Sequence, residues 1–384
     1  MSVRDPSRFD FDTPIDRHHT ASEKWDKYRG RDIIPLWVAD MDFRSPPAIL
    51  EALHERVNHG VFGYTAPPER LAATVLSSLH QHYGWTVAAD WLVWLPGLVC
   101  GLNVACRAVG SIGAEVLTST PIYPPFMTAP TLAGRATIKV PLRLNGQRWE
   151  MDLEALEQAI TPRARLFLLC NPHNPVGRVW TQEELSGLAE LAARHDLIIC
   201  SDEIHAGLIL DADKDHLPFA MLGPEIARRT ITLHAPSKTF NIPGLGCAFA
   251  VISDPELRKS FRHAMAGIVP HVNLLGYAAT EAAYRLGEPW RRQLITYLRG
   301  NRDLVLQAVA TMPGLSATPV EATYLAWIDT RQRGIHHPAH FFEEAGVGLS
   351  DGAAFDLPGF IRLNFGCPRS LLAEALQRMQ KALA

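Results

Sequence analysis

Three polar side chains of different chemistry stand shortly after three apolar runs of this chain. Asn174 follows RLFLLC, Asp202 follows LIICS, and Lys238 follows TITLHA. Charged side chains are rarely buried without partners, so the position of a lysine just after the end of a core strand requires an explanation. Together the three residues offer a nucleophilic amine, a carboxylate that can hold a proton and an amide that can donate a hydrogen bond.

The apolar runs have the composition of buried strands, and amphipathic stretches separate them. Between the first two runs, TQEELSGLAELAARHD opens with a capping box of Thr181 and Glu184. The apolar face of the helix predicted there consists of Leu185, Leu188, Leu191 and Ala192. Such alternation from about residue 90 to 255 predicts a mostly parallel sheet covered by helices. Ligands of open parallel sheets bind beyond the carboxyl ends of the strands, so the three polar residues are predicted to converge there.

An amine, a carboxylate and an amide at one sheet edge suit pyridoxal phosphate. The lysine would form a Schiff base with the cofactor, the carboxylate would hold a proton on the pyridine nitrogen, and the amide would donate to the ring's phenolate oxygen. We therefore predict that Lys238 is a covalent catalyst, with Asp202 and Asn174 as its partners at the ring. Taken singly, each residue has a plainer interpretation: a solvated lysine, a helix cap and a turn.

Three segments in this order, HNPVG, SDEIH and APSKTFNIPGL, resemble fold-type I pyridoxal-phosphate enzymes, the aspartate aminotransferase superfamily, and the likeness runs over nearly the whole chain. The chain also resembles the MalY/PatB-type cystathionine β-lyase branch in KWDKY, WVADMDF, HGVFGYT, ATYLAWID and FIRLNFGCP. The resemblance implies an α/β fold of the aspartate aminotransferase type. In that fold, a large domain with a mostly parallel sheet covered by helices is joined by a smaller α+β domain.

The resemblance implies roles for residues at matching positions. It makes Lys238 the Schiff-base lysine, Asp202 the pyridinium partner and Asn174 the donor to the ring oxygen. His205 falls where transaminases usually have tyrosine, and it is expected near the same ring oxygen. Tyr123, in TPIYPPF, matches the aromatic residue that stacks on the ring.

Further positions match contacts to the phosphate and to the substrate. PGLVCGL matches the glycine-bearing turn at a helix N-terminus, whose amides, chiefly those of Val99 and Cys100, should bind the phosphate. Ser237 could add a hydroxyl. Tyr64 matches the tyrosine that reaches the phosphate of a neighbouring subunit, which implies a homodimer with active sites at the interface. Arg362 matches the arginine that binds the substrate carboxylate through a bidentate contact.

Two positions depart from the pattern of the superfamily. Transaminases commonly place an arginine eight residues after the lysine to bind the phosphate, whereas this chain has Gly246 there. Three residues before the lysine, where many members have serine, it has Ala235. Other groups must then compensate the negative charge of the phosphate.

The motifs are compatible with two reactions. Lys238 is the expected base for the Cα proton of a bound amino acid. With a sulfur leaving group on Cβ the result is elimination to thiol, pyruvate and ammonia, and without one it is transamination. The branch resemblance favours a carbon–sulfur β-lyase acting on L-cystathionine or a cysteine S-conjugate. An aminotransferase, or other pyridoxal-phosphate chemistry in a biosynthetic pathway, is the alternative, and the intact site set argues against a binding protein without turnover.

Composition limits the partners of this chain. Its 384 residues are 47% hydrophobic and 20% charged with a net charge of -3, which argues against a surface for polyanions. The N-terminus has no apolar stretch typical of a signal peptide, and no run reaches the roughly 18 apolar residues of a membrane span. We expect a cytoplasmic enzyme that acts on a small molecule and binds neither nucleic acid nor membrane.

Neither cysteines nor histidines suggest a metal site. The six cysteines form no Cys-x-x-Cys pair and several lie in apolar runs, which predicts buried free thiols. His336 and His340 are spaced as helical ligands, but Pro338 disfavours the helix that would align them. Glu343 and Glu344 suit the acidic first turn of a helix that starts there.

The sequence changes in character after about residue 283. A long charged helix, the strand-like TYLAWID and a final helix from SLLAEALQRMQKAL follow. We predict three parts: residues 1–45, which join the small domain, residues 46–285, which form the large cofactor-binding domain, and residues 286–384, which form the small C-terminal domain.

Overall fold

The computed structural model describes residues 9–384. Its helices are α1 Glu23–Asp26, α2 Pro47–His59, α3 Glu69–Tyr83, α4 Leu98–Ala108, α5 Pro125–Leu132, α6 Leu153–Ala159, α7 Gln182–Arg194, α8 Pro224–Arg228, α9 Pro255–Met265, α10 Leu274–Leu286, α11 Glu288–Thr311, α12 Pro338–Glu344 and α13 Arg369–Leu383. Its strands are β1 Ile34–Pro35, β2 Leu92–Leu95, β3 Glu115–Thr120, β4 Ala136–Pro141, β5 Arg143–Asn145, β6 Arg148–Glu150, β7 Ala164–Cys170, β8 Ile198–Asp202, β9 Thr230–His234, β10 Ala248–Val251, β11 Ser316–Ala317, β12 Leu325–Asp329, β13 Val347–Gly348, β14 Ser350–Asp351 and β15 Phe360–Asn364.

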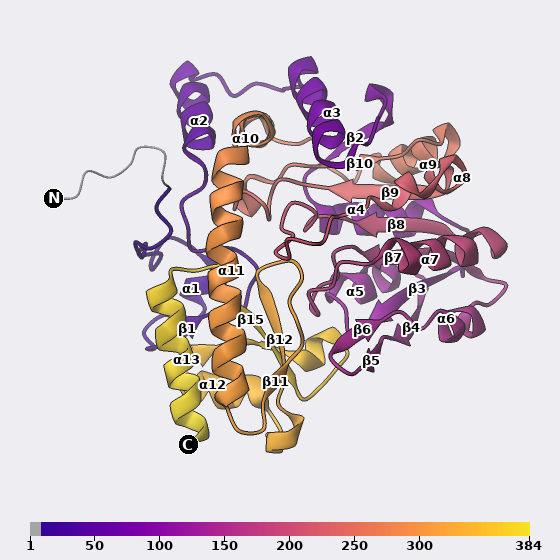
Figure 1. Cartoon of the computed structure of the whole chain (residues 1–384). Helices are drawn as coiled ribbons and strands as arrows, with labels where there is room; N and C mark the ends of the chain where they lie inside the picture. The colour runs from indigo at the N-terminus through magenta and orange to yellow at the C-terminus, as the bar shows by residue number, and fades with distance from the viewer. Residues whose placement is uncertain (1–8) are drawn as a thin grey trace.

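A seven-stranded sheet of order β2-β10-β9-β8-β7-β3-β4 forms the centre of the larger part of the molecule (Figure 1). The pairs β9–β8, β8–β7, β7–β3 and β3–β4 are parallel, whereas β10 is antiparallel to both of its neighbours. The mostly parallel sheet is therefore confirmed. The three apolar runs that precede Asn174, Asp202 and Lys238 form β7, β8 and β9, which are adjacent in the sheet.

Alternate residues of the central strands pack against different helices. In β7, Leu166 and Leu168 belong to a core with residues of α4, α5 and α9, whereas Phe167 and Leu169 pack with residues of α6 and α7. This period of two covers both faces with helices, as parallel sheets require. The predicted helix between β7 and β8 is α7, with Thr181 and Glu184 in a capping box. Its predicted apolar face, Leu185, Leu188, Leu191 and Ala192, is buried.

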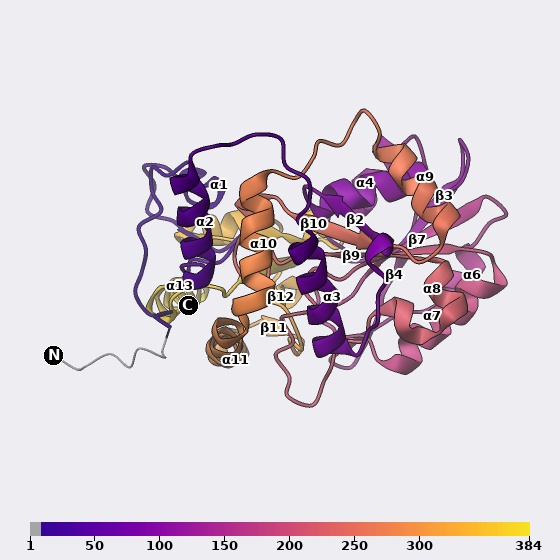
Figure 2. The same cartoon turned by 90° about the horizontal axis from the view of Figure 1, so that it is seen from above.

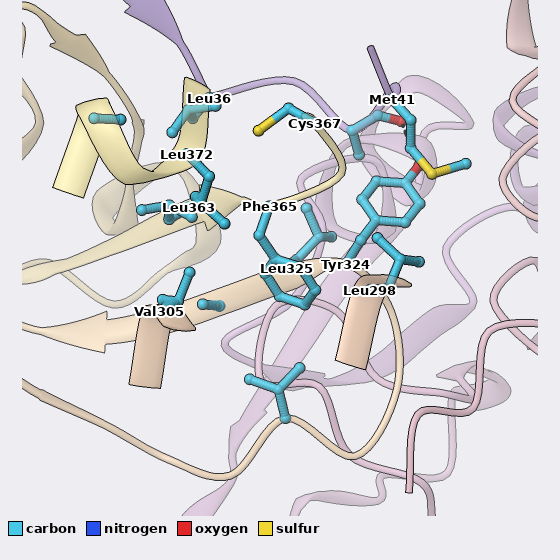
Figure 3. Close-up of a cluster of buried hydrophobic side chains, with 14 of the residues drawn as sticks. Leu36, Met41, Leu298, Val305, Tyr324, Leu325, Leu363, Phe365, Cys367 and Leu372 are labelled. Atoms are coloured by element: carbon cyan, nitrogen blue, oxygen red, sulfur yellow. Dashed lines mark hydrogen bonds between the residues drawn. The ribbon is translucent and has the colours of Figure 1, made fainter. Parts of the chain in front are cut away.

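The C-terminal part of the chain forms a second, antiparallel sheet of order β11-β12-β15-β14. Its core includes side chains from α11, β12, β15 and α13, several of which are drawn in Figure 3. The N-terminal segment reaches this part, because β1 pairs in parallel with β13 through Ile34 and Val347. Helix α10 lies between α2 and α3 and contacts both (Figure 2). The domain limits near residues 45 and 285 stay predictions.

The prediction of free cysteine thiols is confirmed, and of the prediction for the helix near His336 one part is confirmed and one part is wrong. All six cysteines are free and five are buried, while Cys100 is half-buried. Helix α12 begins at Pro338, so His336 lies outside it. Glu343 and Glu344 lie in its last turn and not in its first, so that part of the prediction was wrong. Glu343 instead pairs with Arg31 at 2.7 Å.

Within residues 9–384, none of the helices combines the length and the apolar character that crossing a bilayer requires. In the same residues no group of three or more histidine, cysteine, aspartate or glutamate side chains has an arrangement suited to a metal ion. The cytoplasmic location stays a prediction.

Candidate active site

The structure brings the predicted polar residues to one edge of the large sheet. Asn174 follows β7, Asp202 ends β8 and Lys238 follows β9, so all three lie at carboxyl ends of neighbouring parallel strands. Arg362 reaches this edge from β15 of the second sheet, and its Nη1 donates to Asn174 Oδ1 at 3.1 Å. The candidate site therefore lies where the two sheets meet.

Among the described residues, the amine of Lys238 has one hydrogen-bond partner, which is a backbone group. Its Nζ donates to the carbonyl oxygen of Ala39 at 2.6 Å. Burial and the charge of Arg362 lower the pKa of Lys238 to about 8, while the carboxylates of Asp40 and Asp202 oppose this shift. A lysine with this pKa is partly neutral near physiological pH, as a nucleophile or proton acceptor must be.

Asp202 and Glu203 are consecutive carboxylates with different surroundings. Burial raises the pKa of Asp202 to about 7, against the opposing effects of the Ile204 N–H, which donates to Oδ1 at 3.1 Å, and of His234 and Lys238. A protonated ring nitrogen beside Asp202 would favour the ionised carboxylate.

Glu203 is directed elsewhere and lines a cavity of about 770 Å³ with His216 and His234. It accepts hydrogen bonds from Ser201 Oγ at 2.8 Å and from the Phe219 N–H at 3.0 Å, and it pairs with His216 Nε2 at 2.7 Å. Although burial opposes it, the contact with His216 lowers the pKa of Glu203 to about 2. Asp202 is thus the carboxylate of the pair that is available to the candidate site.

His205 and Tyr123 complete the ring-binding set that the sequence predicts. Burial, together with the charges of Lys238 and Arg362, lowers the pKa of His205 to about 3, so its imidazole is neutral at physiological pH. Its Nδ1 is buried and has no hydrogen-bond partner within the described part of the chain. Tyr123 follows β3, and burial raises its pKa while Arg362 lowers it and Asp202 raises it. Tyr123 therefore lies within electrostatic range of Arg362 and Asp202, and its stacking on the ring stays a prediction.

Arg362 is a buried cation with unused hydrogen-bonding capacity. Besides Asn174, it donates from Nη2 to the carbonyl oxygen of Trp37 at 2.9 Å and to Ser350 Oγ at 3.3 Å. Its guanidinium lies over the ring of Phe355 at 4.6 Å. Burial lowers its pKa to about 10, which leaves it protonated. Since Nε is buried without a partner in the described residues, an anion would complete the environment of this group.

The N-terminus of α4 fits a phosphate. Its N-cap is Gly97, no side chain within residues 9–384 caps it, and Val99 in its first turn is 43% exposed. A Cβ placed at Gly97 would meet no atom within 4 Å, so the space in front of this turn is open. Free backbone N–H groups at a helix N-terminus attract anions. The half-buried Cys100 and Ser237 lie in this turn and directly before Lys238, and their phosphate contacts stay predictions.

The glycine that replaces the usual arginine has a structural reason. Gly246 has a φ of +55°, a conformation that favours glycine, and a Cβ there would lie 3.1 Å from the carbonyl oxygen of Pro96. Pro96 belongs to the turn that leads into α4. A larger residue at position 246 would therefore strain the connection next to the predicted phosphate site.

Within a single chain the structure does not bring Tyr64 to the other site residues. It lies between α2 and α3 with its side chain fully exposed, at 109%. The structure also adds contacts to which the sequence analysis assigns no role. The carbonyl oxygen of Ala39, which accepts from Lys238, also accepts from Tyr324 Oη at 2.9 Å. Both residues lie in segments quoted for the branch resemblance, and that was the available signal.

These residues could hold pyridoxal phosphate. The buried Nδ1 of His205, which has no partner among the described residues, matches the ring oxygen of the cofactor, and the open turn before α4 matches its phosphate. The amine of Lys238 matches the aldehyde, and the carboxylate of Asp202, with its raised pKa, matches the ring nitrogen.

Comparison with known proteins gives consistent relatives over almost the full length. The family model for aminotransferase class I and II matches residues 31–379. The chain is 37% identical to cystathionine beta-lyase PatB of Bacillus subtilis (strain 168), over 97% of this chain and 100% of that protein. Among solved structures, OvoB is similar with a TM-score of 0.96 and 49% identity, covering 98% of this chain and 99% of that one. The pyridoxal-phosphate-bound C–S lyase from Staphylococcus hominis has a TM-score of 0.92 and 32% identity, with 98% of each chain covered.

Proposed function

The chain belongs to the aminotransferase class I and II family, and from this premise we propose that it is a pyridoxal-phosphate-dependent carbon–sulfur β-lyase. The observation that carries the proposal is the meeting of Lys238, Asp202, Asn174 and Arg362 at one edge of the large sheet, in a chain similar to a cystathionine β-lyase over nearly its whole length. The substrate class is L-cystathionine or a related cysteine S-conjugate.

Each residue has a distinct task in this proposal. Lys238 binds the cofactor and then, as a neutral amine, takes the Cα proton of the substrate. Asp202 keeps the ring nitrogen protonated, and Asn174 and His205 contact the ring oxygen. Tyr123 stacks on the ring. When bound, pyridoxal phosphate supplies the electron sink that stabilises negative charge at Cα.

The remaining residues bind the two anionic groups. Arg362 binds the α-carboxylate of the substrate through its free donors, and the first turn of α4, with Val99 and Cys100, binds the phosphate with help from Ser237. A dicarboxylate transaminase needs two cationic groups to bind both ends of its substrate, whereas a β-lyase needs one and room for a variable thioether tail. Among the predicted site residues, only Arg362 serves this purpose, which supports the lyase.

The test is pyruvate formation from L-cystathionine with and without 2-oxoglutarate. A β-lyase releases pyruvate, ammonia and thiol in the absence of a keto acid. If no pyruvate forms, and glutamate and the 2-oxo acid of cystathionine accumulate in equal amounts when 2-oxoglutarate is supplied, the lyase proposal is wrong and the aminotransferase takes its place.

The proposal includes a homodimer with shared sites. Tyr64 is fully exposed, and Val57, Val61 and Phe62 beside it are exposed by 50%, 60% and 58%. Apolar side chains grouped in this way are typical of a protein interface. A second copy of the chain packed on this segment would cover it and bring Tyr64 to the phosphate site of the partner subunit.

Heterodimers test this arrangement. A Lys238→Ala chain mixed with a Tyr64→Ala chain should regain activity, because one of the two sites in each heterodimer would be intact. Exchange of subunits must be demonstrated separately with tagged chains. Exchange without recovery of activity would contradict shared sites.

A further inference from the structure

Residues 37–43, called the strap below, contact the candidate site through their backbone. The carbonyl oxygen of Ala39 accepts hydrogen bonds from Lys238 Nζ and Tyr324 Oη, at 2.6 and 2.9 Å. The carbonyl oxygen of Trp37 accepts from Arg362 Nη2 at 2.9 Å and from Ser350 Oγ at 2.7 Å. The strap therefore accepts hydrogen bonds from both Lys238 and Arg362.

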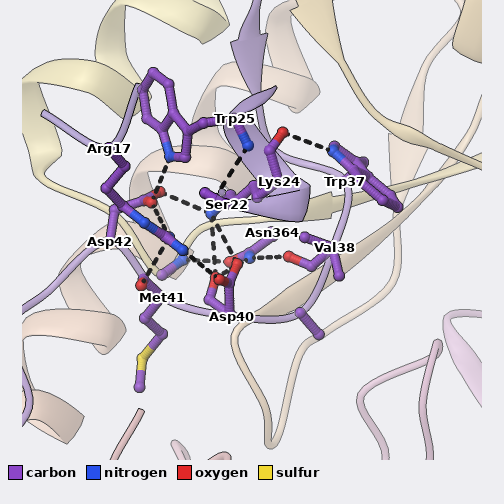
Figure 4. A network of polar contacts seen from close by, with 12 residues as sticks. Arg17, Ser22, Lys24, Trp25, Trp37, Val38, Asp40, Met41, Asp42 and Asn364 are labelled. Carbon is purple, nitrogen blue, oxygen red and sulfur yellow. Dashed lines mark hydrogen bonds and ion pairs between the residues drawn. The ribbon is translucent and has the colours of Figure 1, made fainter. Parts of the chain in front are cut away.

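A cluster of four charged side chains holds the strap (Figure 4). Arg17 pairs with Asp40 and with Asp42, each at 2.6 Å, and Lys24 pairs with Asp42 at 2.7 Å. The side chain of Lys24 is fully buried and that of Asp42 is 2% exposed. Two cations and two carboxylates balance in charge, and the loss of one member would leave a partner buried and unpaired.

Two asparagines bind the backbone of the strap from elements of the active site. Asn364, at the end of β15, donates to the carbonyl oxygens of Val38 and Asp40 at 2.6 and 2.7 Å. Asn241, three residues after Lys238, accepts from the Met41 N–H at 2.9 Å. The strap is thus bonded to the two segments that carry Arg362 and Lys238, although it belongs to neither main sheet.

The two aspartates of the cluster differ in their relation to the lysine. Asp42 accepts from Arg17, Lys24 and Trp25 Nε1, which compensate its charge. Asp40 Oδ1 is buried and accepts no hydrogen bond in the described part of the chain, with Lys24 Nζ at 3.8 Å. The charge of Asp40 acts on Lys238 and raises its pKa against burial and Arg362. Asp42 has no comparable effect among the causes of that shift.

We infer that Asp40 is a positioning residue for Lys238: through its ion pair with Arg17 it anchors the strap whose Ala39 carbonyl oxygen accepts from the lysine amine, and it places a carboxylate directly after the residue that this amine contacts. The inference rests on the proposed function only in taking Lys238 as the reactive amine. The charged and titratable groups that face this amine are Arg362 from β15, Asp202 and His205 from the end of β8, Tyr324 before β12, and Asp40 from the strap.

The test measures the amine directly. The full-length chain is freed of cofactor, pyridoxal phosphate is added at a series of pH values, and the rate of its covalent capture is followed by borohydride trapping and peptide mapping. Because the neutral amine reacts, the rate rises with pH through a midpoint that reports the pKa of Lys238. For Asp40→Asn we expect this midpoint to fall by about 1 pH unit, since a carboxylate that favoured the charged amine is gone.

A purely structural role of Asp40 predicts the opposite sign. A loosened strap would let water reach Lys238 and would move the midpoint upward, toward the value of a solvated lysine. Asp42→Asn is the matched control, because it weakens the same cluster without removing the charge that acts on Lys238, and its midpoint should stay at the wild-type value or rise. An unmoved or raised midpoint for Asp40→Asn overturns the inference.

A second comparison guards against failure of Asp40→Asn to fold. Arg17→Gln should raise the midpoint, since the charge of Asp40 is then less compensated. The double variant Arg17→Gln/Asp40→Asn leaves neither residue as an unpaired ion, and its midpoint should fall below that of Arg17→Gln alone. Equal midpoints overturn the inference. If trapping labels a lysine other than Lys238, the proposed function fails and the inference with it, whereas a label on Lys238 with unmoved midpoints defeats the inference alone.

Discussion

At the end of the large sheet the candidate site presents side chains, whereas at the strap it presents backbone carbonyl oxygens. Asn174, Asp202 and Lys238 are placed by the parallel pairing of β7, β8 and β9. The carbonyl oxygens of Trp37 and Ala39 are placed by ion pairs and asparagine hydrogen bonds. The first arrangement depends on many apolar contacts and backbone hydrogen bonds, and the second on a few charged groups.

The difference predicts which side of the candidate site a single substitution outside its functional side chains can disturb. Strand pairing is shared among many residues, so the sheet side should lose chemistry only when the functional side chain itself is changed. The strap side should respond to substitutions at residues that never touch a substrate. The predictions below test the two sides in order of expected effect.

The largest effect is expected on the sheet side, at Lys238. In the proposed function Lys238 is both the covalent attachment point and the base, so Lys238→Ala should lower turnover by about 10⁴-fold or more. Pyruvate release and the visible absorbance of bound cofactor are the measurements. Lys259→Ala, at an exposed lysine of α9, is the control and should behave as wild type. A Lys238→Ala chain in which borohydride still fixes the cofactor covalently would contradict the role of Lys238.

Arg362 joins the two sides, because it contacts both Asn174 and the carbonyl oxygen of Trp37. Arg362→Ala should lower kcat/KM by about 30-fold to several thousand-fold, since a buried carboxylate contact is worth about 2 to 5 kcal/mol. Cofactor affinity should change far less. Arg331 is a suitable control, because it also lies over an aromatic ring, that of Phe360 at 4.7 Å, but is 55% exposed. Equal losses of kcat/KM in Arg331→Ala and Arg362→Ala would show that Arg362 has no specific role in binding the substrate.

Asp202 gives a pH-dependent prediction for the cofactor-free chain. Its pKa of about 7 lies above the usual value of 3.8, so the folded state binds the proton more tightly and loses stability as pH rises from about 4 to about 7. Asp202→Asn cannot ionise. Its Tm should therefore exceed that of wild type at pH 8, and the difference should shrink toward pH 4. Thermal unfolding followed by circular dichroism provides the comparison, and a difference independent of pH would mean that burial does not raise this pKa.

The smallest effect concerns the scaffold behind the sheet side. In the capping box of α7, Thr181 Oγ1 accepts from the Glu184 N–H at 3.3 Å and the Thr181 N–H donates to Glu184 Oε2 at 2.9 Å. Thr181→Ala should lower the free energy of unfolding by about 1 kcal/mol and leave kcat and KM unchanged. Thr181→Ser should restore most of the stability. A kinetic defect in Thr181→Ala of the size expected for Arg362→Ala would contradict the expectation that the sheet side loses chemistry only when a functional side chain is changed.

The sequence allowed the sheet side to be predicted because its functional groups are side chains that follow recognisable strands. The meeting of Asn174, Asp202 and Lys238 at one sheet edge was predicted from strand ends alone, and Arg362 was added from resemblance; their functional roles stay predictions. The strap could not be found in this way, since a carbonyl oxygen is the same in every residue and its placement depends on contacts between distant segments, such as Arg17 with Asp40. The acidic pair in α12 was misplaced for a related reason: Glu343 pairs with Arg31, more than 300 positions away.

Asp202 and Glu203 are consecutive in the chain, yet Asp202 belongs to the candidate site and Glu203 is paired with His216. What separates them is the alignment of β8 with β7, in which Asp202 stands opposite Cys170. Successive strand residues point to opposite faces, so a slip of one position would exchange the two carboxylates. Insertions or deletions of a single codon in residues 198–202 should therefore be selected against far more strongly than conservative substitutions of the apolar residues there. A deep mutational scan that includes length variants would then show that β8 does not tolerate changes in length.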